Sequence, residues 1–150
     1  MKKITVLIVD DHPLIRKAWG FTISQDSRFK VVGEIESGEA AVEVVKQLCP
    51  DIVIMDICLT GISGIEATQL IRMNCPDSKI IGLSFHVNLE VVHEMIQRGA
   101  MGYLTKNASI EEIFKAIAEV SSGRTYICQE VENTFKGDLK VQENLKRNSL

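Results

Sequence analysis

The chain has 150 residues, 45% of them hydrophobic and 25% charged, a composition that matches one globular domain with a single core. Its net charge of -3 is small and of the wrong sign for a protein that wraps nucleic acid or an anionic membrane. The sequence has no apolar run of about 18 residues, no signal-peptide pattern and no CxxC motif among its four cysteines, so we expect a cytoplasmic protein with reduced thiols and no membrane partner.

Five short apolar runs, rich in branched residues, predict β-strands. Between them, the stretches 37–48 and 109–120 place their apolar residues on one helical face, with Ser37 and Ser109 as N-caps. Strands that alternate with helices through short links predict a doubly wound α/β fold with a parallel sheet. In chain order, the candidate strands are 4–9, 30–35, 51–56, 79–84 and 102–106.

The stretch that follows Gly123 has a different character. Residues 124–150 are polar and mixed in charge, and Gly137 interrupts the one short helix that they could form. We therefore expect a domain over residues 1–123, followed by a short helix and a linker or tail over 124–150.

Polar side chains follow four of the predicted strands. Asp10 and Asp11 follow the first strand, Asp56 ends the third, Ser84 ends the fourth and Lys106 ends the fifth. In an open parallel sheet, ligands bind beyond the carboxyl ends of the strands. We therefore expect three carboxylates, a hydroxyl and an ammonium group to converge at one edge.

Three clustered carboxylates need positive charge nearby. Two unit charges about 4 Å apart repel each other by roughly 4 kcal/mol at an effective dielectric constant near 20. Lys106 supplies one compensating charge, and Mg²⁺, which prefers carboxylates, water and phosphate oxygens, could supply the rest. A carboxylate beside Mg²⁺ and a lysine can act as a nucleophile toward a phosphoryl group, so Asp56 is the predicted acceptor.

Four segments together resemble the receiver domain of two-component response regulators over residues 4 to about 122. The "DDHP", "LSxH" and "GYLTKN" elements are most similar to the NarL/FixJ subfamily, whose receivers precede a LuxR-type helix-turn-helix domain. The resemblance implies a five-stranded sheet of order 2-1-3-4-5 with helices on both faces. The segments are "VLIVDDHPLIRKAW", "DIVIMDICLTGISGIEATQLIR", "IIGLSFH" and "GAMGYLTKNAS".

The resemblance implies a phosphoacceptor and a metal site. An aspartate placed like Asp56 is phosphorylated by a sensor histidine kinase, and a pair placed like Asp10 and Asp11 holds Mg²⁺. Asp11 and Asp56 would be direct ligands, Asp10 would act through water, and the backbone carbonyl of Cys58 would complete the protein's share.

The resemblance also implies a conformational switch. Ser84 matches the hydroxyl that moves to bind the phosphoryl group, Lys106 matches the lysine that pairs with that group, and Tyr103 matches the aromatic residue that swings inward. Phe85 departs from the small residue frequent at its position, and we expect its bulk to narrow access to the phosphate.

Other interpretations of the same residues stay open at this stage. Asp10 and Asp11 could only cap the helix that begins near Pro13, Ser84 could be a turn hydroxyl, and Lys106 and Tyr103 could be a surface charge and a packing residue. An aspartate-based Mg²⁺-dependent phosphatase would need a second carboxylate at the position of Cys58. We therefore expect no enzyme beyond self-phosphorylation and slow dephosphorylation. A receiver that only mediates protein contacts is a further alternative.

The expected output is control of transcription through a DNA-binding domain that this chain lacks, since residues 124–150 are too few for one. Either the sequence stops in the linker before that domain, which we favour, or the chain is a stand-alone receiver that acts by phosphorelay or protein contact. We expect the helix 88–98, the strand 102–106 and the helix 109–121 to form the output face, and phosphorylation to favour a homodimer.

Overall fold

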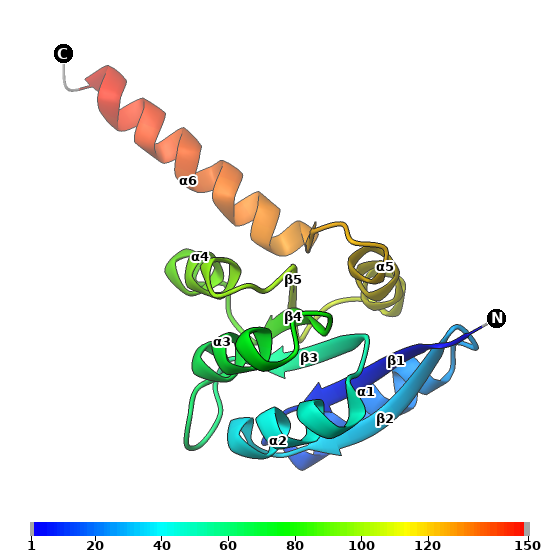
Figure 1. Cartoon of the computed structure of the whole chain (residues 1–150). Coiled ribbons are helices and arrows are strands. Elements are labelled where there is room, and N and C mark those ends of the chain that lie inside the picture. The colour runs from blue at the N-terminus through cyan, green and yellow to red at the C-terminus, as the bar shows by residue number, and fades with distance from the viewer. Residues whose placement is uncertain (1, 149–150) are drawn as a thin grey trace.

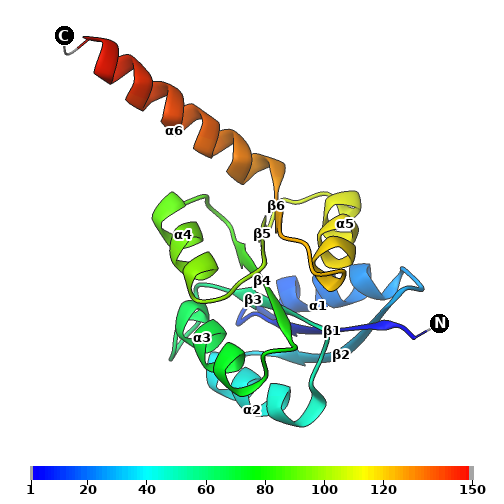
Figure 2. The same ribbon diagram turned by 45° about the horizontal axis from the view of Figure 1, so that its top comes forward.

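The computed structural model describes residues 2–148, which form a parallel β-sheet with helices on both faces (Figure 1). Helices α1 and α5 cover one face, and α2, α3 and α4 cover the other (Figure 2). The elements are β1 (Ile4–Val9), α1 (Pro13–Ser24), β2 (Phe29–Ile35), α2 (Gly38–Leu48), β3 (Ile52–Asp56), α3 (Gly64–Asn74), β4 (Lys79–Ser84), α4 (Leu89–Gln97), β5 (Gly102–Thr105), α5 (Ile110–Ser121), β6 (Tyr126–Ile127) and α6 (Gln129–Asn148).

The sheet has the strand order β2-β1-β3-β4-β5-β6, and every neighbouring pair is parallel. The predicted doubly wound fold and the order of its first five strands are confirmed. The expected number of strands was one too low, because Tyr126–Ile127 pairs with Gly102–Tyr103 at the edge of the sheet. Two residues are too few to show a strand periodicity in the sequence.

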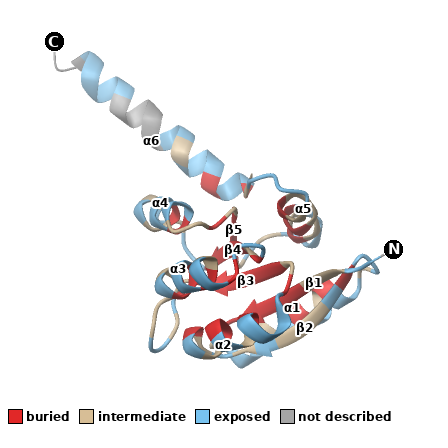
Figure 3. Ribbon diagram, in the orientation of Figure 1, coloured by how far each residue is buried: buried red, intermediate tan, exposed pale blue. Residues whose placement is uncertain are grey.

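The core lies between the sheet and its two helical layers. Every residue of β3 is buried, as are the last four of β1, and both are interior strands of the sheet (Figure 3). A strand that is covered on both faces accepts apolar residues at successive positions, which explains why these runs do not alternate with polar residues. Two of the caps also form as expected, because Ser37 Oγ accepts the Ala40 N–H and Ser109 Oγ accepts the Glu112 N–H.

The segment after α5 differs from the expected short, interrupted helix. Helix α6 runs without a break through Gly137, although glycine inside a helix costs about 1 kcal/mol relative to alanine. Its first turn packs on the sheet, where Cys128 and Val131 are fully buried. The remainder projects away from the sheet (Figure 1). The predicted boundary near residue 123 falls between α5 and β6, and residues beyond it contribute to the core.

Among residues 2–148, no helix combines the length and the apolar character that crossing a bilayer requires.

Candidate functional site

Acidic side chains meet at the carboxyl edge of the sheet, as the strand ends predict. Asp10 follows β1, Asp56 is the last residue of β3, and Lys106 follows β5. The carboxylates of Asp10, Asp11 and Asp56 and the imidazole of His12 each place one potential ligand atom within 4.8 Å of the others. Four groups from two neighbouring strand ends therefore form one cluster.

Lys106 is the buried cation of this cluster. Its Nζ donates a hydrogen bond to Asp56 Oδ2 at 3.1 Å and lies 2.9 Å from Asp10 Oδ2, without hydrogen-bond alignment to the latter. The Lys106 side chain is only 2% exposed, and those of Asp10 and Asp56 are 1% exposed. The alternative of a solvated surface lysine is therefore wrong.

His12, which is not among the predicted site residues, also belongs to the cluster. His12 Nδ1 lies 3.0 Å from Asp10 Oδ1, 3.0 Å from Asp11 Oδ1 and 3.9 Å from Asp56 Oδ2. The only sequence signal was its position directly after two aspartates. His12 is also the N-cap residue of α1, and the helix has no side-chain cap, so Asp10 and Asp11 do not serve as caps.

The carboxylates fit a divalent cation. Asp10 Oδ2 and Asp11 Oδ1 are buried atoms with no hydrogen-bond partner among the described residues. A buried carboxylate oxygen that accepts no hydrogen bond costs free energy. The Lys106 ammonium group offsets part of that cost at Asp10 Oδ2, and a hard cation with oxygen ligands would stabilise both atoms. Thr60 Oγ1 donates to Asp11 Oδ2 at 3.1 Å and holds that side chain toward the cluster. The donor set therefore suits Mg²⁺, while the expected role of the Cys58 carbonyl stays a prediction.

The two buried aspartates differ in their affinity for protons. Burial raises the pKa of Asp56 to about 6, against the opposing effects of the Cys58 N–H and Lys106. Burial would also raise the pKa of Asp10, but the hydrogen bond from the His12 N–H and the adjacent Lys106 ammonium group outweigh burial and hold this pKa below the ordinary value. Without a further cation, Asp56 thus holds a proton more readily than Asp10.

Ser84 and Tyr103 contact each other beside the acidic cluster. The Tyr103 hydroxyl donates to Ser84 Oγ at 2.9 Å, and Ser84 Oγ donates to the His86 carbonyl at 2.8 Å. Tyr103 is fully buried and packs against Gly82, where an added Cβ would lie 2.9 Å from the tyrosine ring. The two residues with expected switch roles are therefore linked, although their movement stays a prediction.

A cavity of about 270 Å³ opens over Asp56, and Phe85 is part of its lining. Lys106 Nζ lies 4.5 Å from the centre of the Phe85 ring, and the ring meets the His12 imidazole edge-on at 5.9 Å. The phenyl group is 43% exposed. It therefore lies between solvent and the lysine that contacts Asp56, while narrowed access to the phosphate stays a prediction.

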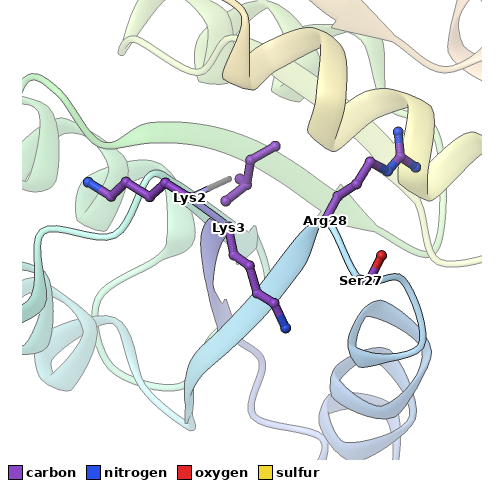
Figure 4. A pocket seen from close by; sticks show the side chains of 5 residues that line it. Lys2, Lys3, Ser27 and Arg28 are labelled. Carbon is purple, nitrogen blue, oxygen red and sulfur yellow. The ribbon is translucent and has the colours of Figure 1, made fainter.

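A second pocket, of about 340 Å³, lies at the opposite, amino edge of the sheet. Its lining includes Lys2, Lys3, Ser27 and Arg28 (Figure 4). Arg28 already pairs with Asp26 at 2.7 Å. This pocket holds none of the predicted site residues.

Comparison with known proteins agrees with this arrangement. The family model described as "Response regulator receiver domain" matches residues 6–118. The response regulator UvrY of Escherichia coli is 40% identical over 128 residues, which are 85% of this chain and 59% of that protein. The transcriptional regulatory protein DegU of Brevibacillus brevis is 36% identical over 133 residues, 89% of this chain and 56% of DegU. The chain thus spans between half and two thirds of these relatives' lengths.

The fold is also similar to solved structures of response regulators. A LuxR-family response regulator from Aurantimonas has a TM-score of 0.86 at 28% identity, covering 91% of this chain and 98% of that one. The signal receiver domain of the NarL regulator of Mycobacterium tuberculosis has a TM-score of 0.80 at 31% identity, covering 83% of this chain and all of that one.

Proposed function

This chain belongs to the response regulator receiver domain family, and on that premise we propose that it is a phosphorylation switch whose acceptor is Asp56. The observation that carries the proposal is the buried contact of 3.1 Å between Lys106 Nζ and Asp56 Oδ2 at the floor of an open cavity. A nucleophilic carboxylate needs a neighbouring cation that offsets the charge on the transferring oxygens, and Lys106 supplies it.

The transfer itself requires little of the protein beyond positioning. A sensor histidine kinase would present its phosphorylated imidazole; a bond would form from an Asp56 oxygen to phosphorus, and the bond to the kinase nitrogen would break. The Cys58 N–H donates to Asp56 Oδ1 at 3.1 Å and fixes the orientation of the carboxylate. Asp10, Asp11 and Asp56 would hold Mg²⁺, with the Cys58 carbonyl as a further ligand. The metal would neutralise charge on the phosphoryl oxygens.

The switch that follows would begin at Ser84. A phosphoryl group adds close to two negative charges and three strong hydrogen-bond acceptors, which can draw Ser84 Oγ from the His86 carbonyl. Tyr103 donates to the same Oγ and would move with it. The change would reach the surface of α4, β5 and α5, where we propose that a homodimer or another partner binds.

The output is proposed to be control of transcription. UvrY is named a response regulator and DegU a transcriptional regulatory protein, and both are longer than the segment matched here. DNA would be bound only through a further effector domain. A receiver that acts by phosphorelay or protein contact is the alternative, and cytoplasm is the proposed compartment because the four cysteines are free thiols.

Incubation with acetyl phosphate and Mg²⁺, followed by intact mass measurement, tests the acceptor. We expect one phosphoryl adduct, which disappears in Asp56→Asn and on addition of a chelator. Asp77→Asn, which alters an exposed acid outside the cluster, is the matched control and should keep the adduct. An adduct that persists in Asp56→Asn would contradict the proposal, as would failure of the unaltered chain to gain one.

A further inference from the structure

The proposed phosphotransfer leaves His12 without a task, although its ring nitrogen lies inside the acidic cluster. Nδ1 is 3.0 Å from one oxygen of Asp10 and 3.0 Å from one oxygen of Asp11. The imidazole is 50% exposed, so an exchanging ion can reach it from solvent. No other histidine joins a group of potential metal ligands among residues 2–148.

The shortest contacts of Lys106 and of His12 are to different oxygens of the cluster, although His12 Nδ1 also lies 3.9 Å from Asp56 Oδ2. Lys106 Nζ faces Oδ2 of Asp10 and of Asp56, whereas His12 Nδ1 faces Oδ1 of Asp10 and of Asp11. Among the described residues, Asp11 Oδ1 is a buried atom without a hydrogen-bond partner, and Asp10 Oδ2 has only the ion pair with Lys106. A cation that bound between the aspartates could therefore take His12 Nδ1 as a ligand without displacing Lys106.

The addition of one nitrogen changes which ions such a site prefers. Mg²⁺ is bound through oxygen, keeps several waters and gains little from imidazole. Zn²⁺ and Co²⁺ bind histidine nitrogen together with carboxylate oxygen, and Zn²⁺ commonly takes four such ligands. Four ligand atoms, three from carboxylates and one from imidazole, lie within 4.8 Å of one another here.

We propose that His12 is a ligand that lets this cluster bind a divalent transition ion of the Zn²⁺ class in competition with Mg²⁺. The inference rests on the metal site of the proposed function but not on phosphorylation. Because both ions use Asp11 and Asp56, their binding is mutually exclusive. An ion of the Zn²⁺ class would also engage the Asp56 carboxylate and so oppose phosphoryl transfer.

Calorimetric titration of the reduced full chain, with Zn²⁺ and with Mg²⁺ separately, tests the role of His12. We expect His12→Asn to weaken Zn²⁺ binding by about tenfold or more, while Mg²⁺ affinity stays nearly unchanged. Loss of a residue that only orients a metal ligand already weakens binding by about tenfold or more in other metal sites. His12→Gln should behave in the same way and covers the case in which the first variant folds poorly. Equal losses for both metals, or an unchanged Zn²⁺ affinity, would overturn the proposal.

Two controls exclude other Zn²⁺ ligands. His93→Asn changes a histidine on α4 outside the cluster and should leave Zn²⁺ affinity as it was. Cys58→Ser removes the exposed thiol that lines the same cavity, and the effect of His12→Asn should persist in that background. If the effect vanishes with the thiol, cysteine is the ligand and the proposal fails.

Co²⁺ gives a spectroscopic readout of the same ligand. The visible absorption spectrum of the Co²⁺-loaded chain should change in His12→Asn and not in His93→Asn, and an unchanged spectrum would contradict nitrogen ligation.

These experiments separate the two proposals. Zn²⁺ binding that depends on His12 in a chain that never becomes phosphorylated would leave the inference standing and refute the switch. Phosphorylation with Zn²⁺ binding indifferent to His12 would do the reverse.

Discussion

The buried carboxylate of Asp56 has an electrostatic cost when it is ionised, and a bound cation would offset that cost. Its side chain is 1% exposed beside Asp10, and burial raises its pKa to about 6 even though Lys106 is in contact. Above that pH the metal-free protein must keep a second buried carboxylate ionised next to the first. The proposed acceptor residue is therefore expected to destabilise the folded state.

Replacement of Asp56 should accordingly stabilise the metal-free protein. The native pKa of about 6 exceeds the ordinary value of 3.8, so the native state holds a proton that the unfolded chain releases, and stability falls as pH rises between those values. The full difference corresponds to about 3 kcal/mol. Urea unfolding in chelator should show Asp56→Asn to be about 1–3 kcal/mol more stable than the parent at pH 7, with a smaller gain near pH 4.

The comparison needs a control, because other carboxylates titrate over the same range. Asp77→Asn removes an exposed acid, and its stability difference from the parent should not vary in this way. If Asp56→Asn were less stable than the parent at pH 7, the ionised Asp56 carboxylate would not destabilise the metal-free fold.

Phe85 affects the same pocket through its ring. The phenyl face lies 4.5 Å from Lys106 Nζ, and such a contact with a cation contributes about 0.5–2 kcal/mol. Phe85→Ala should open the cavity and free the lysine, so we expect phosphorylation by acetyl phosphate and loss of the phosphoryl group both to become a few-fold faster, on the order of that contribution. Phe21→Ala, at an exposed phenylalanine on α1, is the control. Both rates unchanged in Phe85→Ala would refute the gating role.

At the scale of elements, the first turn of α6 is hydrogen-bonded to β5 beside the acidic cluster. The Thr105 hydroxyl donates to Glu130 Oε2 at 2.7 Å, and Thr105 directly precedes Lys106. The Glu112 carboxylate accepts from both the Tyr126 hydroxyl and the Gln129 N–H, so it joins α5 to β6 and α6. His93 of α4 also meets the ring of Phe135 at 5.4 Å. The first turns of α6 therefore rest on the α4, β5 and α5 surface that we propose for output.

Two apolar residues of α6 test where its contribution to stability ends. Val131 is fully buried and Leu145 is 64% exposed. Val131→Ala should cost about 1–2 kcal/mol of unfolding free energy, since each buried methylene contributes about 0.8 kcal/mol. Leu145→Ala should change it by less than about 0.5 kcal/mol. Urea titrations of both variants measure the difference, and equal losses would show that the distal helix is packed as tightly as its start.

The elements that the sequence predicted are those whose signals are local. Apolar runs identified β1 and β3, and Ser37 and Ser109 marked helix starts through their own hydrogen bonds. Strand β6 depends on a free edge of β5, and α6 continues past Gly137 with its first turn held on the sheet, so neither is encoded in its own residues alone. The convergence of Asp10, Asp56 and Lys106 followed from strand ends, whereas the position of His12 depends on the path of the chain from β1 into α1.

At the scale of the whole molecule, the fold holds mutually repelling carboxylates together at the carboxyl edge of the sheet. β1 and β3 are neighbouring interior strands of the sheet, and the residues at their ends cannot separate without breaking its pairing. The only buried cation that contacts them among residues 2–148 comes from beyond β5, two strands away from β3. An added cation at this edge should therefore stabilise the entire cooperative unit rather than one loop.

Thermal unfolding with and without Mg²⁺ measures that stabilisation. A ligand that binds only the folded state at one hundred times its dissociation constant adds about 2.7 kcal/mol, which in a chain of this size raises Tm by roughly 5–10 °C. We expect such a rise for the parent and its disappearance with chelator. In Asp11→Asn, which removes a proposed direct ligand without burying a new charge, the rise should be largely lost. If Asp11→Asn gained as much from Mg²⁺ as the parent, the ion would bind elsewhere, and the buried oxygens of Asp10 and Asp11 that accept no hydrogen bond among the described residues would need another explanation.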